Sequence, residues 1–597
     1  MTTSVPTAID SHSCARPEQV RVTHLDLDLT LDFQQQIAFG TVALALERHD
    51  LKAPLQLDTA ELTIEAVRDG GGTPLEFQLG AAVPHLGRPL RVDLRSDTGS
   101  VVVQYRTAPS AAAMQWLQPA QTAGGRQPFL FTQGQAILTR SWIPLQDSPS
   151  VRVSWAARIR APQGLRPVMS AMHGRAAEDG GFTFEMPQPV PSYLIALACG
   201  DLERREISQR CAVWAEPSVV TAAARELEDM EQMVAACEQL FGPYRWGRYD
   251  LIILPPSFPF GGMENPCLTF ATPTLLAGDK SLVALVAHEL AHSWSGNLVT
   301  NATWRDFWLN EGFTVYLERR IMEQVYGKDR ADMELVLGMQ KLAAELRELP
   351  AGDQILHIDL AGRDPDDAMT EVPYEKGAAF LRRLEQVFGR GPFDRFLRDY
   401  FAGHAFQSIT TAEFEDWLQQ HLLAAAPDQA RQIDVQQWLH AAGLPADAAV
   451  PASRAFQEVD ALRAAFLRDR SGKQVQQGGQ RFVSQQWQRF LEGMPADLDA
   501  RALQELDAAL DFTHSGNAEL LCAWLRLAIR ADYRTAMPAL EQFLVAVGRR
   551  KFIKPLYEEL LKARDGKARA AAIYQRARPH YHTVAVRTLD PLLGYHG

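Results

Sequence analysis

The residues best suited to chemistry lie in one stretch, Ala287 to Glu311, which contains a HExxH pentad formed by His288, Glu289 and His292. On a helix, residues four apart differ by about 40° in azimuth and about 6 Å in rise, so both imidazoles can bind one metal ion from the same face. Glu311, the third candidate ligand, lies in a second helical segment. Two histidines and one carboxylate bind zinc and leave its fourth position to water, which is typical of a catalytic site.

Glu289 lies between the two histidines and is free to act as a base. Zinc lowers the pKa of a bound water toward neutrality, and a carboxylate one residue along the helix is placed to take that water's proton. The pentad falls within an apolar run, residues 281–294, which predicts a buried helix and argues against a solvated helix face. The sequence therefore predicts metal-assisted hydrolysis with one zinc ion per chain.

Other segments extend this pattern along the chain: PPSFPFGGMENPCLTF from Pro255, WLNEGFTVYLER from Trp308, VPYEKG from Val372 and GRRKF from Gly548. Together with HELAHSWSGNLVTN they resemble the gluzincin zinc aminopeptidases, and within them the leukotriene A(4) hydrolase group. The resemblance covers nearly the full chain, from TQGQA near its front to GRRKF. It implies an aminopeptidase that uses one zinc ion to remove the first residue of short peptides with a free N-terminus.

Removal of the first residue alone requires a group that binds a free α-ammonium, and the resemblance assigns that role to Glu264, assisted by Gln135. Gln133 matches a second polar position of the same pocket. Taken alone, GGxE indicates a tight turn and the two glutamines indicate a solvent-facing strand. The resemblance instead implies a strand that pairs with the substrate backbone, where glycine permits close approach. The residues of this strand that precede Glu264 are Gly261, Gly262 and Met263.

Tyr374, in VPYEKG, is the candidate donor to the carbonyl oxygen that gains charge during peptide hydrolysis. The resemblance assigns it this role, whereas a lone tyrosine at such a border is more often a packing residue. Arg549 and Lys551 match a basic pair that receives the carboxylate end of short peptides, and arginine suits a carboxylate through its bidentate fork. Without the resemblance, RRK indicates a solvated face.

Two alternatives stand beside the peptidase interpretation. Asp366 matches an aspartate used in lipid-epoxide hydrolysis, so one alternative is a bifunctional enzyme, although Met369 stands where the epoxide hydrolase has a tyrosine. The second alternative is a catalytically silent scaffold that binds peptides through its helical C-terminal part. An intact ligand set together with Glu289 argues against the scaffold, because a retained base has no use there.

Composition and charge exclude several other classes of protein function. The formal net charge of −12 argues against nonspecific nucleic-acid binding, which needs clustered Lys and Arg. The six scattered cysteines form no CxxC pair and are expected to be free thiols in a reducing compartment. The chain shows no secretory signal pattern, and no uninterrupted apolar run reaches 18 residues, so no membrane span is expected. We expect a cytoplasmic, monomeric enzyme.

The organisation of the chain predicts a multidomain α+β protein. Short alternating segments such as VTHLDLDLTLDF predict an N-terminal antiparallel β domain over residues 1–201. Residues 202–444 are dominated by helical patterns and resemble a thermolysin-like zinc catalytic domain. A linker rich in Ala and Pro, about residues 441–453, precedes successive amphipathic stretches that predict a C-terminal all-α helical-repeat domain over 445–597.

Overall fold

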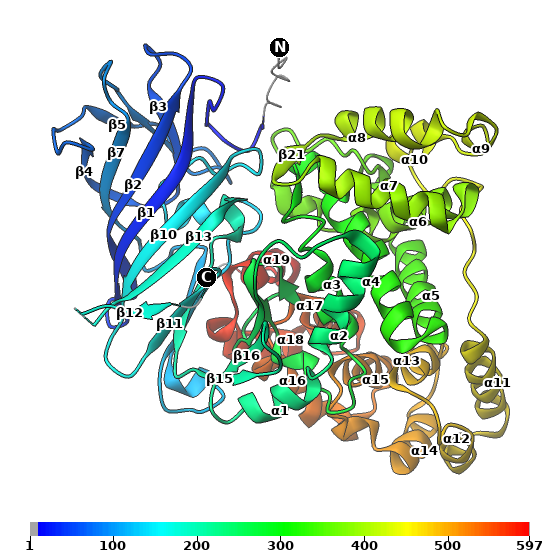
Figure 1. Ribbon diagram of the computed structural model, residues 1–597. Helices are drawn as coiled ribbons and strands as arrows, with labels where there is room; N and C mark the ends of the chain where they lie inside the picture. Colours follow the sequence, from blue (N-terminus) through cyan, green and yellow to red (C-terminus); the bar gives the residue numbers. More distant parts are fainter. Residues whose placement is uncertain (1–9, 173, 179, 596–597) are drawn as a thin grey trace.

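The computed structural model describes residues 10–172, 174–178 and 180–595. Three parts follow one another along the chain, a blue-to-cyan β part, a green central part and a yellow-to-red helical part (Figure 1). The three-part architecture predicted from the sequence is confirmed. The described residues contain no helix long and apolar enough to cross a membrane, and all six cysteines are free thiols.

The N-terminal part is built around a seven-stranded sheet in the order β12-β13-β10-β1-β2-β7-β4. In β1, Leu25, Leu27 and Leu29 are buried while the residues between them are exposed or half-buried, as expected for a strand with one face on a core. The strands of this sheet are β1 (Val20–Asp32), β2 (Ile37–Arg48), β4 (Thr63–Asp69), β7 (Ser100–Arg106), β10 (Arg152–Arg160), β12 (Arg175–Ala176) and β13 (Phe182–Pro191).

One pairing in this sheet departs from the predicted antiparallel domain, because β1 and β10 run parallel. A long stretch of chain separates these strands, and parallel pairing requires such a crossover rather than a tight hairpin. Two smaller sheets complete the N-terminal part. They contain β8 (Met114–Leu117), β9 (Phe129–Thr132), β11 (Arg166–Met169) and β14 (Leu197–Gly200), and β3 (Leu55–Thr59), β5 (Phe77–Leu79) and β6 (Arg88–Val92).

The central part begins with a five-stranded sheet in the order β15-β16-β17-β19-β18, with the short β18 at its edge. A two-stranded sheet pairs β20 with β21 farther on. The strands are β15 (Glu203–Glu206), β16 (Cys211–Ala215), β17 (Tyr249–Ile253), β18 (Gly262–Met263), β19 (Cys267–Ala271), β20 (Val299–Asn301) and β21 (Gln407–Ile409).

The central part contains ten α-helices in the described residues, and one of them, α4, packs against α2, α3, α5 and α6. The sequence predicts an amphipathic helix there, but every residue from Trp308 to Glu318 is buried, because neighbours cover all sides of this segment. The helices are α1 (Val220–Glu226), α2 (Met230–Phe241), α3 (Ala284–Ala291), α4 (Trp308–Tyr326), α5 (Lys328–Glu345), α6 (Gly377–Phe388), α7 (Arg390–Gly403), α8 (Thr411–Leu418), α9 (Pro427–Ala430) and α10 (Val435–His440).

The C-terminal part forms two layers of helices with their own apolar core. Odd-numbered α11, α13, α15, α17 and α19 contact one another in succession, as do α12 with α14 and α16 with α18, which gives an irregular solenoid. Residues 441–453 contain neither helix nor strand. The helices are α11 (Arg454–Asp469), α12 (Gly472–Gly478), α13 (Ser484–Glu492), α14 (Ala500–Leu510), α15 (Ala518–Arg530), α16 (Met537–Ala546), α17 (Arg550–Lys562), α18 (Gly566–Ala577) and α19 (Thr583–Leu593).

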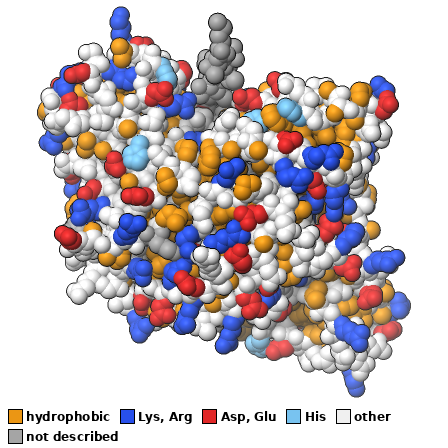
Figure 2. Space-filling view, viewed as in Figure 1, with side chains coloured by type: hydrophobic (Ala, Val, Ile, Leu, Met, Phe, Trp, Pro, Cys, Tyr) orange, Lys and Arg blue, Asp and Glu red, His pale blue; other side chains and the backbone are white. Residues whose placement is uncertain are grey.

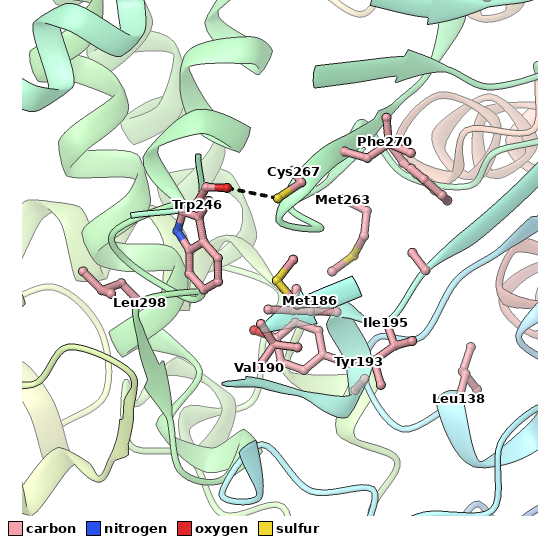
Figure 3. Close-up of a cluster of buried hydrophobic side chains, with 14 of the residues drawn as sticks. Leu138, Met186, Val190, Tyr193, Ile195, Trp246, Met263, Cys267, Phe270 and Leu298 are labelled. Atoms are coloured by element: carbon pink, nitrogen blue, oxygen red, sulfur yellow. Dashed lines mark hydrogen bonds between the residues drawn. The ribbon is translucent and has the colours of Figure 1, made fainter. Parts of the chain in front are cut away.

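An apolar cluster joins the N-terminal and central parts (Figure 3). Met186 and Tyr193 of the first part lie beside Trp246, Met263 and Cys267 of the second, and all five are almost fully buried. This continuous core fixes the two parts relative to each other, because separating them would expose its apolar surface to water.

Polar contacts reinforce that junction at the turn after α3. Arg152 of β10 donates hydrogen bonds to the carbonyl oxygen of Asn297 at 2.6 Å and to the Thr300 hydroxyl at 2.5 Å. The buried Tyr193 hydroxyl donates to the carbonyl oxygen of Gly296 at 3.4 Å. N-terminal side chains therefore hold the turn that follows the HExxH helix.

Candidate active site

The three predicted metal ligands meet where α3 faces α4. One donor atom each from His288, His292 and Glu311 lie within 4.8 Å of one another. Oε2 of Glu311 lies 3.3 Å from Nε2 of His288 and 3.6 Å from Nε2 of His292. Zinc–nitrogen bonds of about 2.0–2.1 Å in a tetrahedral site place donor atoms about 3.3 Å apart. These separations and the chemistry of the donors therefore fit zinc.

The helix that carries both histidines is shorter than the sequence predicts. The apolar run predicts a helix over residues 281–294, but α3 contains only Ala284–Ala291, and His292 follows it as the C-cap. The chain turns there at Gly296, whose φ of 102° is accessible to glycine. A Cβ on Gly296 would lie 2.4 Å from Oδ1 of Asn310, so the turn packs directly against α4.

Each imidazole that faces the predicted metal position has its second nitrogen fixed by a neighbour. Nδ1 of His288 lies 3.0 Å from Oε2 of Glu318, and Nδ1 of His292 lies 3.0 Å from the carbonyl oxygen of Ser295. The Thr314 hydroxyl is also 3.0 Å from Nδ1 of His292. Such contacts set the ring orientation and leave both Nε2 atoms to face the metal position.

Glu289 lies beside the metal position and directly below the β18 edge strand. A Cβ on Gly262 would lie 2.2 Å from Oε1 of Glu289, so a side chain at residue 262 would displace this carboxylate. Burial raises the pKa of Glu289 well above its ordinary value, with Glu264 and Glu311 adding to the rise and His288 opposing it. A carboxylate with a raised pKa is suited to exchange protons near neutral pH.

Glu264 follows the edge strand β18 and is buried against the same centre. Oε1 of Glu264 and Nε2 of Gln135 are both buried and have no hydrogen-bond partner among the described residues. The main chain of Glu264 is held in place by the Asn297 side chain, which donates to its carbonyl oxygen at 2.7 Å. Because unpaired buried polar atoms are costly, this carboxylate and amide are suited to receive a ligand's polar group.

Tyr374 lies on a π-helical turn, Val372–Lys376, immediately before α6. Its ring stacks on that of His288, with ring centroids 6.3 Å apart and an interplanar angle of 17°. Burial and the carboxylates of Glu311 and Glu264 raise the pKa of the phenol well above its ordinary value. The phenol therefore keeps its proton and can donate a hydrogen bond beside the metal position.

One cavity of about 430 Å³ joins these groups to the C-terminal part. Arg549 and Lys551 line it, as predicted, and both are close to Glu519 of α15. A Cβ on Gly261 would lie 2.6 Å from Nη2 of Arg549, so this guanidinium adjoins the segment that leads into β18. The Lys551 ammonium forms an ion pair with the Glu519 carboxylate, and Nη1 of Arg549 lies 4.0 Å from the same oxygen. The predicted residues that line the cavity are Gln135, Gly261, Gly262, Glu264, His288, Glu289, His292, Glu311, Tyr374, Arg549 and Lys551.

Three predicted substrate contacts do not line this cavity: Gln133, Met263 and Asp366. The Gln133 amide donates to the sulfur of Met263 at 3.2 Å, so these two side chains face each other inside the core. Asp366 is half-buried, and its carboxylate accepts a hydrogen bond from the Ala136 amide. Burial and neighbouring Asp364 raise the pKa of Asp366 to about 6. Asp366 thus contacts the loop that carries Gln135.

Sequence reasoning missed several residues that support the site. Glu318 follows Glu311 by seven residues, so the helical repeat places both on one face of α4, and this spacing was a usable signal. Asn310 and Tyr193, which contact each other at 3.4 Å, gave no such signal because they come from distant parts of the chain.

Three family models match the chain in sequence order. The Peptidase M1 N-terminal domain matches residues 21–194, the Peptidase family M1 domain matches residues 225–438, and the C-terminal domain of leukotriene A4 hydrolase matches residues 482–593. Together they span the β part, the metal site and the helical part, in agreement with the resemblance found in the sequence.

Curated relatives and solved structures agree with these models. A leukotriene A-4 hydrolase of Xenopus laevis is 36% identical, with 96% of this chain and 97% of the relative covered. Leucine aminopeptidase 2 of Yarrowia lipolytica is 35% identical, with 96% and 92% covered. Yeast leukotriene A4 hydrolase with bestatin matches at a TM-score of 0.92 and 32% identity, over 99% and 98% of the two chains. The chain belongs to the peptidase M1 family and is a zinc aminopeptidase with the three-part architecture of leukotriene A4 hydrolase.

Proposed function

We propose that this aminopeptidase removes the first residue of short peptides, and that different residues of the cavity bind the metal, transfer protons and bind the substrate. The main support is that a single cavity contains the metal ligands, an acidic group without a partner, a protonated phenol and a basic pair. These are the groups that a peptide with two charged ends requires. The alternative of a silent scaffold is wrong, because the family assignment makes the protein a hydrolase.

His288, His292 and Glu311 would hold the zinc ion. When bound there, zinc supplies a Lewis acid that lowers the pKa of water and stabilises negative charge on oxygen. Glu289 takes a proton from the attacking water and later delivers it to the leaving amine. Tyr374 donates a hydrogen bond to the peptide carbonyl oxygen as that oxygen gains charge.

The Glu264 carboxylate and the side-chain oxygen of Gln135 accept hydrogen bonds from the substrate ammonium, and this contact restricts cleavage to the first residue. The β18 strand lies at the edge of its sheet, so the backbone of an extended peptide can pair with it. Arg549 and Lys551, which line the same cavity, receive the terminal carboxylate of a short peptide.

A panel of aminoacyl fluorogenic substrates, assayed with and without a chelator, tests this function. We expect hydrolysis of substrates with a free amine, loss of hydrolysis after chelation, and recovery when zinc is restored. N-acetylated versions of the same substrates are the matched control and are expected to remain intact. Equal cleavage of acetylated substrates, or full activity in metal-free protein, would contradict the assignment.

A second candidate activity, lipid-epoxide hydrolysis, is favoured by relatives that are named leukotriene A-4 hydrolase. The structure gives it weaker support, because Asp366 lies outside the cavity lining and Met369 lies within it. Incubation with an allylic fatty-acid epoxide followed by product analysis separates the two activities. Formation of a single diol isomer above the uncatalysed background would establish the second activity.

Other features of the protein stay predictions that complete this proposal. We propose domain boundaries at residues 1–201, 202–444 and 445–597, with a linker at about 441–453. We also propose that the enzyme is a cytoplasmic monomer that binds neither nucleic acid nor membranes. On the face shown in Figure 2, cationic and anionic side chains are interspersed, which supports the nucleic-acid part of this prediction.

A further inference from the structure

The wall of the active-site cavity contains more acidic groups than catalysis and amine binding require. Nine glutamates and five lysines or arginines line it. Three of the glutamates, Glu264, Glu289 and Glu311, belong to the proposed chemistry. The other six lie toward α4, α5, the π-helical turn and the C-terminal helices: Glu318, Glu334, Glu345, Glu371, Glu375 and Glu519.

Five of these six carboxylates already have partners. Glu318 contacts His288, Glu375 pairs with Arg319 at 2.8 Å, Glu334 pairs with Arg330 at 3.2 Å, and Glu519 pairs with Lys551. The fifth, Glu345, accepts a hydrogen bond at 2.5 Å from the main-chain amide of the sixth, Glu371.

Glu371 is the exception. Within residues 10–595, leaving aside 173 and 179, its carboxylate has no hydrogen bond and no ion pair within 4.0 Å, although the residue is half-buried in the cavity wall. Burial raises the pKa of Glu371, with Glu375 and Glu345 adding to the rise, while the charges of Lys341 on α5 and Lys551 on α17 oppose it. The Glu371 carboxylate keeps some exposure at the cavity wall, so a cationic group of a ligand can pair with it directly.

The position of Glu371 relative to the reacting bond is set by its neighbours. It immediately precedes the π-helical turn that carries Tyr374, and its charge acts on the Tyr374 phenol. The Lys551 ammonium, which is proposed to bind the substrate's carboxylate, also acts electrostatically on Glu371 and lowers its pKa. Glu371 therefore faces the portion of a bound peptide that lies after the scissile bond.

Met369 adds an apolar surface at the same place. It lines the cavity two residues before Glu371 and packs partly buried against the main core. Lysine and arginine carry long methylene stems, which favour apolar contact, and charged heads, which favour a carboxylate. Methionine is flexible enough to follow stems of different shape. An apolar side chain beside an unpaired carboxylate is the combination that a basic side chain needs.

We propose that Met369 and Glu371 form a subsite for a basic side chain, lysine or arginine, at the second residue of the substrate. This subsite deepens the proposed aminopeptidase function and rests on it. The excess of acidic groups over basic groups in the cavity acts in the same direction, because a cleft dominated by one sign of charge concentrates ligands of the opposite sign.

The test compares Leu-Lys with Leu-norleucine, two dipeptides of similar shape that differ in the side-chain charge of the second residue. We expect the wild-type kcat/KM to favour Leu-Lys by about five- to tenfold, the range for a charge-assisted contact that is partly screened by solvent. Glu371→Gln is expected to reduce this ratio below about twofold. Glu371→Lys is expected to reverse it and to favour Leu-Glu.

Glu348→Gln is the matched control, because it removes the same charge from an exposed residue outside the cavity lining. It is expected to keep the wild-type ratio. A wild-type ratio near one, or a ratio that survives Glu371→Gln, overturns the subsite, and so does a preference for acidic second residues. Such a preference would show that Lys341 determines selectivity instead.

Binding measurements separate failure of the subsite from failure of the proposed function. Calorimetric titration of both dipeptides into zinc-loaded Glu289→Gln protein measures the dissociation-constant ratio without turnover. If no dipeptide is hydrolysed by the wild type yet Leu-Lys binds about fivefold more tightly, the proposed function fails and the subsite stands. Equal dissociation constants overturn the subsite whether or not peptides are cleaved.

Discussion

The two walls of the active-site cavity satisfy their polar groups in opposite ways. On the wall formed by α3, α4 and β18, Oε2 of Glu311 and Oε1 of Glu264 are buried without hydrogen-bond partners in the described chain. On the wall formed by the C-terminal helices, the main charges pair with each other, as Lys551 does with Glu519. In the first wall, carboxylate oxygens lack hydrogen-bond partners within the part of the protein that the structure describes. In the second wall, the charged side chains already form ion pairs before a ligand binds.

This contrast indicates where each wall acts during catalysis. Groups whose partners are missing from the protein gain most when a metal ion, an ammonium or a developing charge supplies the partner. Groups that already have partners gain less, because a ligand must replace an existing contact. Changes in the first wall should therefore lower kcat, and changes in the second should mainly alter KM and substrate preference.

The largest expected effect comes from Glu289→Gln in the first wall. Loss of the base should lower kcat by about 10²- to 10⁴-fold, the range attributed to general acid–base catalysis. Zinc content should remain at one ion per chain, because the three proposed ligands, His288, His292 and Glu311, are unchanged in this variant. Steady-state kinetics and atomic absorption on the same sample provide the two measurements. Turnover close to the wild type would remove Glu289 from its proposed role and weaken the contrast between the walls.

An intermediate effect is expected for Lys551→Met in the second wall. For tripeptides with a free carboxylate, KM should rise about fivefold while kcat stays within about twofold, because one charge-assisted contact is lost. Aminoacyl anilides, which lack that carboxylate, should show no change. Lys554→Met, on the same helix but outside the cavity lining, is the matched control. A fall in kcat with unchanged KM would contradict the division between the walls.

An effect on stability rather than on turnover separates the fold from the chemistry of the site. His582 is fully buried and stacks on Phe131 of the N-terminal part, and burial lowers its pKa to about 3. Below pH 6.5 the unfolded chain binds a proton that the folded chain does not, so stability falls as pH decreases toward 3. Between pH 7 and pH 5 this costs about 2 kcal/mol.

His582→Asn is expected to make this acid loss shallower, since asparagine can still accept the Val584 amide hydrogen bond but does not titrate. Thermal unfolding at several pH values gives the slope for each protein. Because the comparison uses slopes, a general loss of stability in the variant does not affect the outcome. Parallel curves for both proteins would show that other groups control the acid transition.

Sequence was most informative where function and local structure share one pattern. The pentad spacing identified His288 and His292, and the family resemblance extended the site to Glu264, Tyr374 and the basic pair. The sequence was not informative for features that depend on packing between distant segments. The all-round burial of α4 and the parallel pairing of β1 with β10 depend on neighbours distant in the chain. The free carboxylate of Glu371 is likewise recognisable only when its surroundings are known.

The hydrogen bonds from the N-terminal part to the turn after His292 limit which segments of this enzyme can be deleted. Arg152 and Tyr193 supply hydrogen-bond donors to main-chain oxygens of that turn, so an excised central fragment would leave those oxygens without their donors and expose the apolar cluster of the junction. Trimming from the opposite terminus removes the basic pair and also the main-chain amides of Gly548 and Arg550, which donate to the carbonyl oxygens of Pro256 and Pro259 in the segment before β18. Neither end of the chain can therefore be removed without loss of contacts to the segments around the metal position.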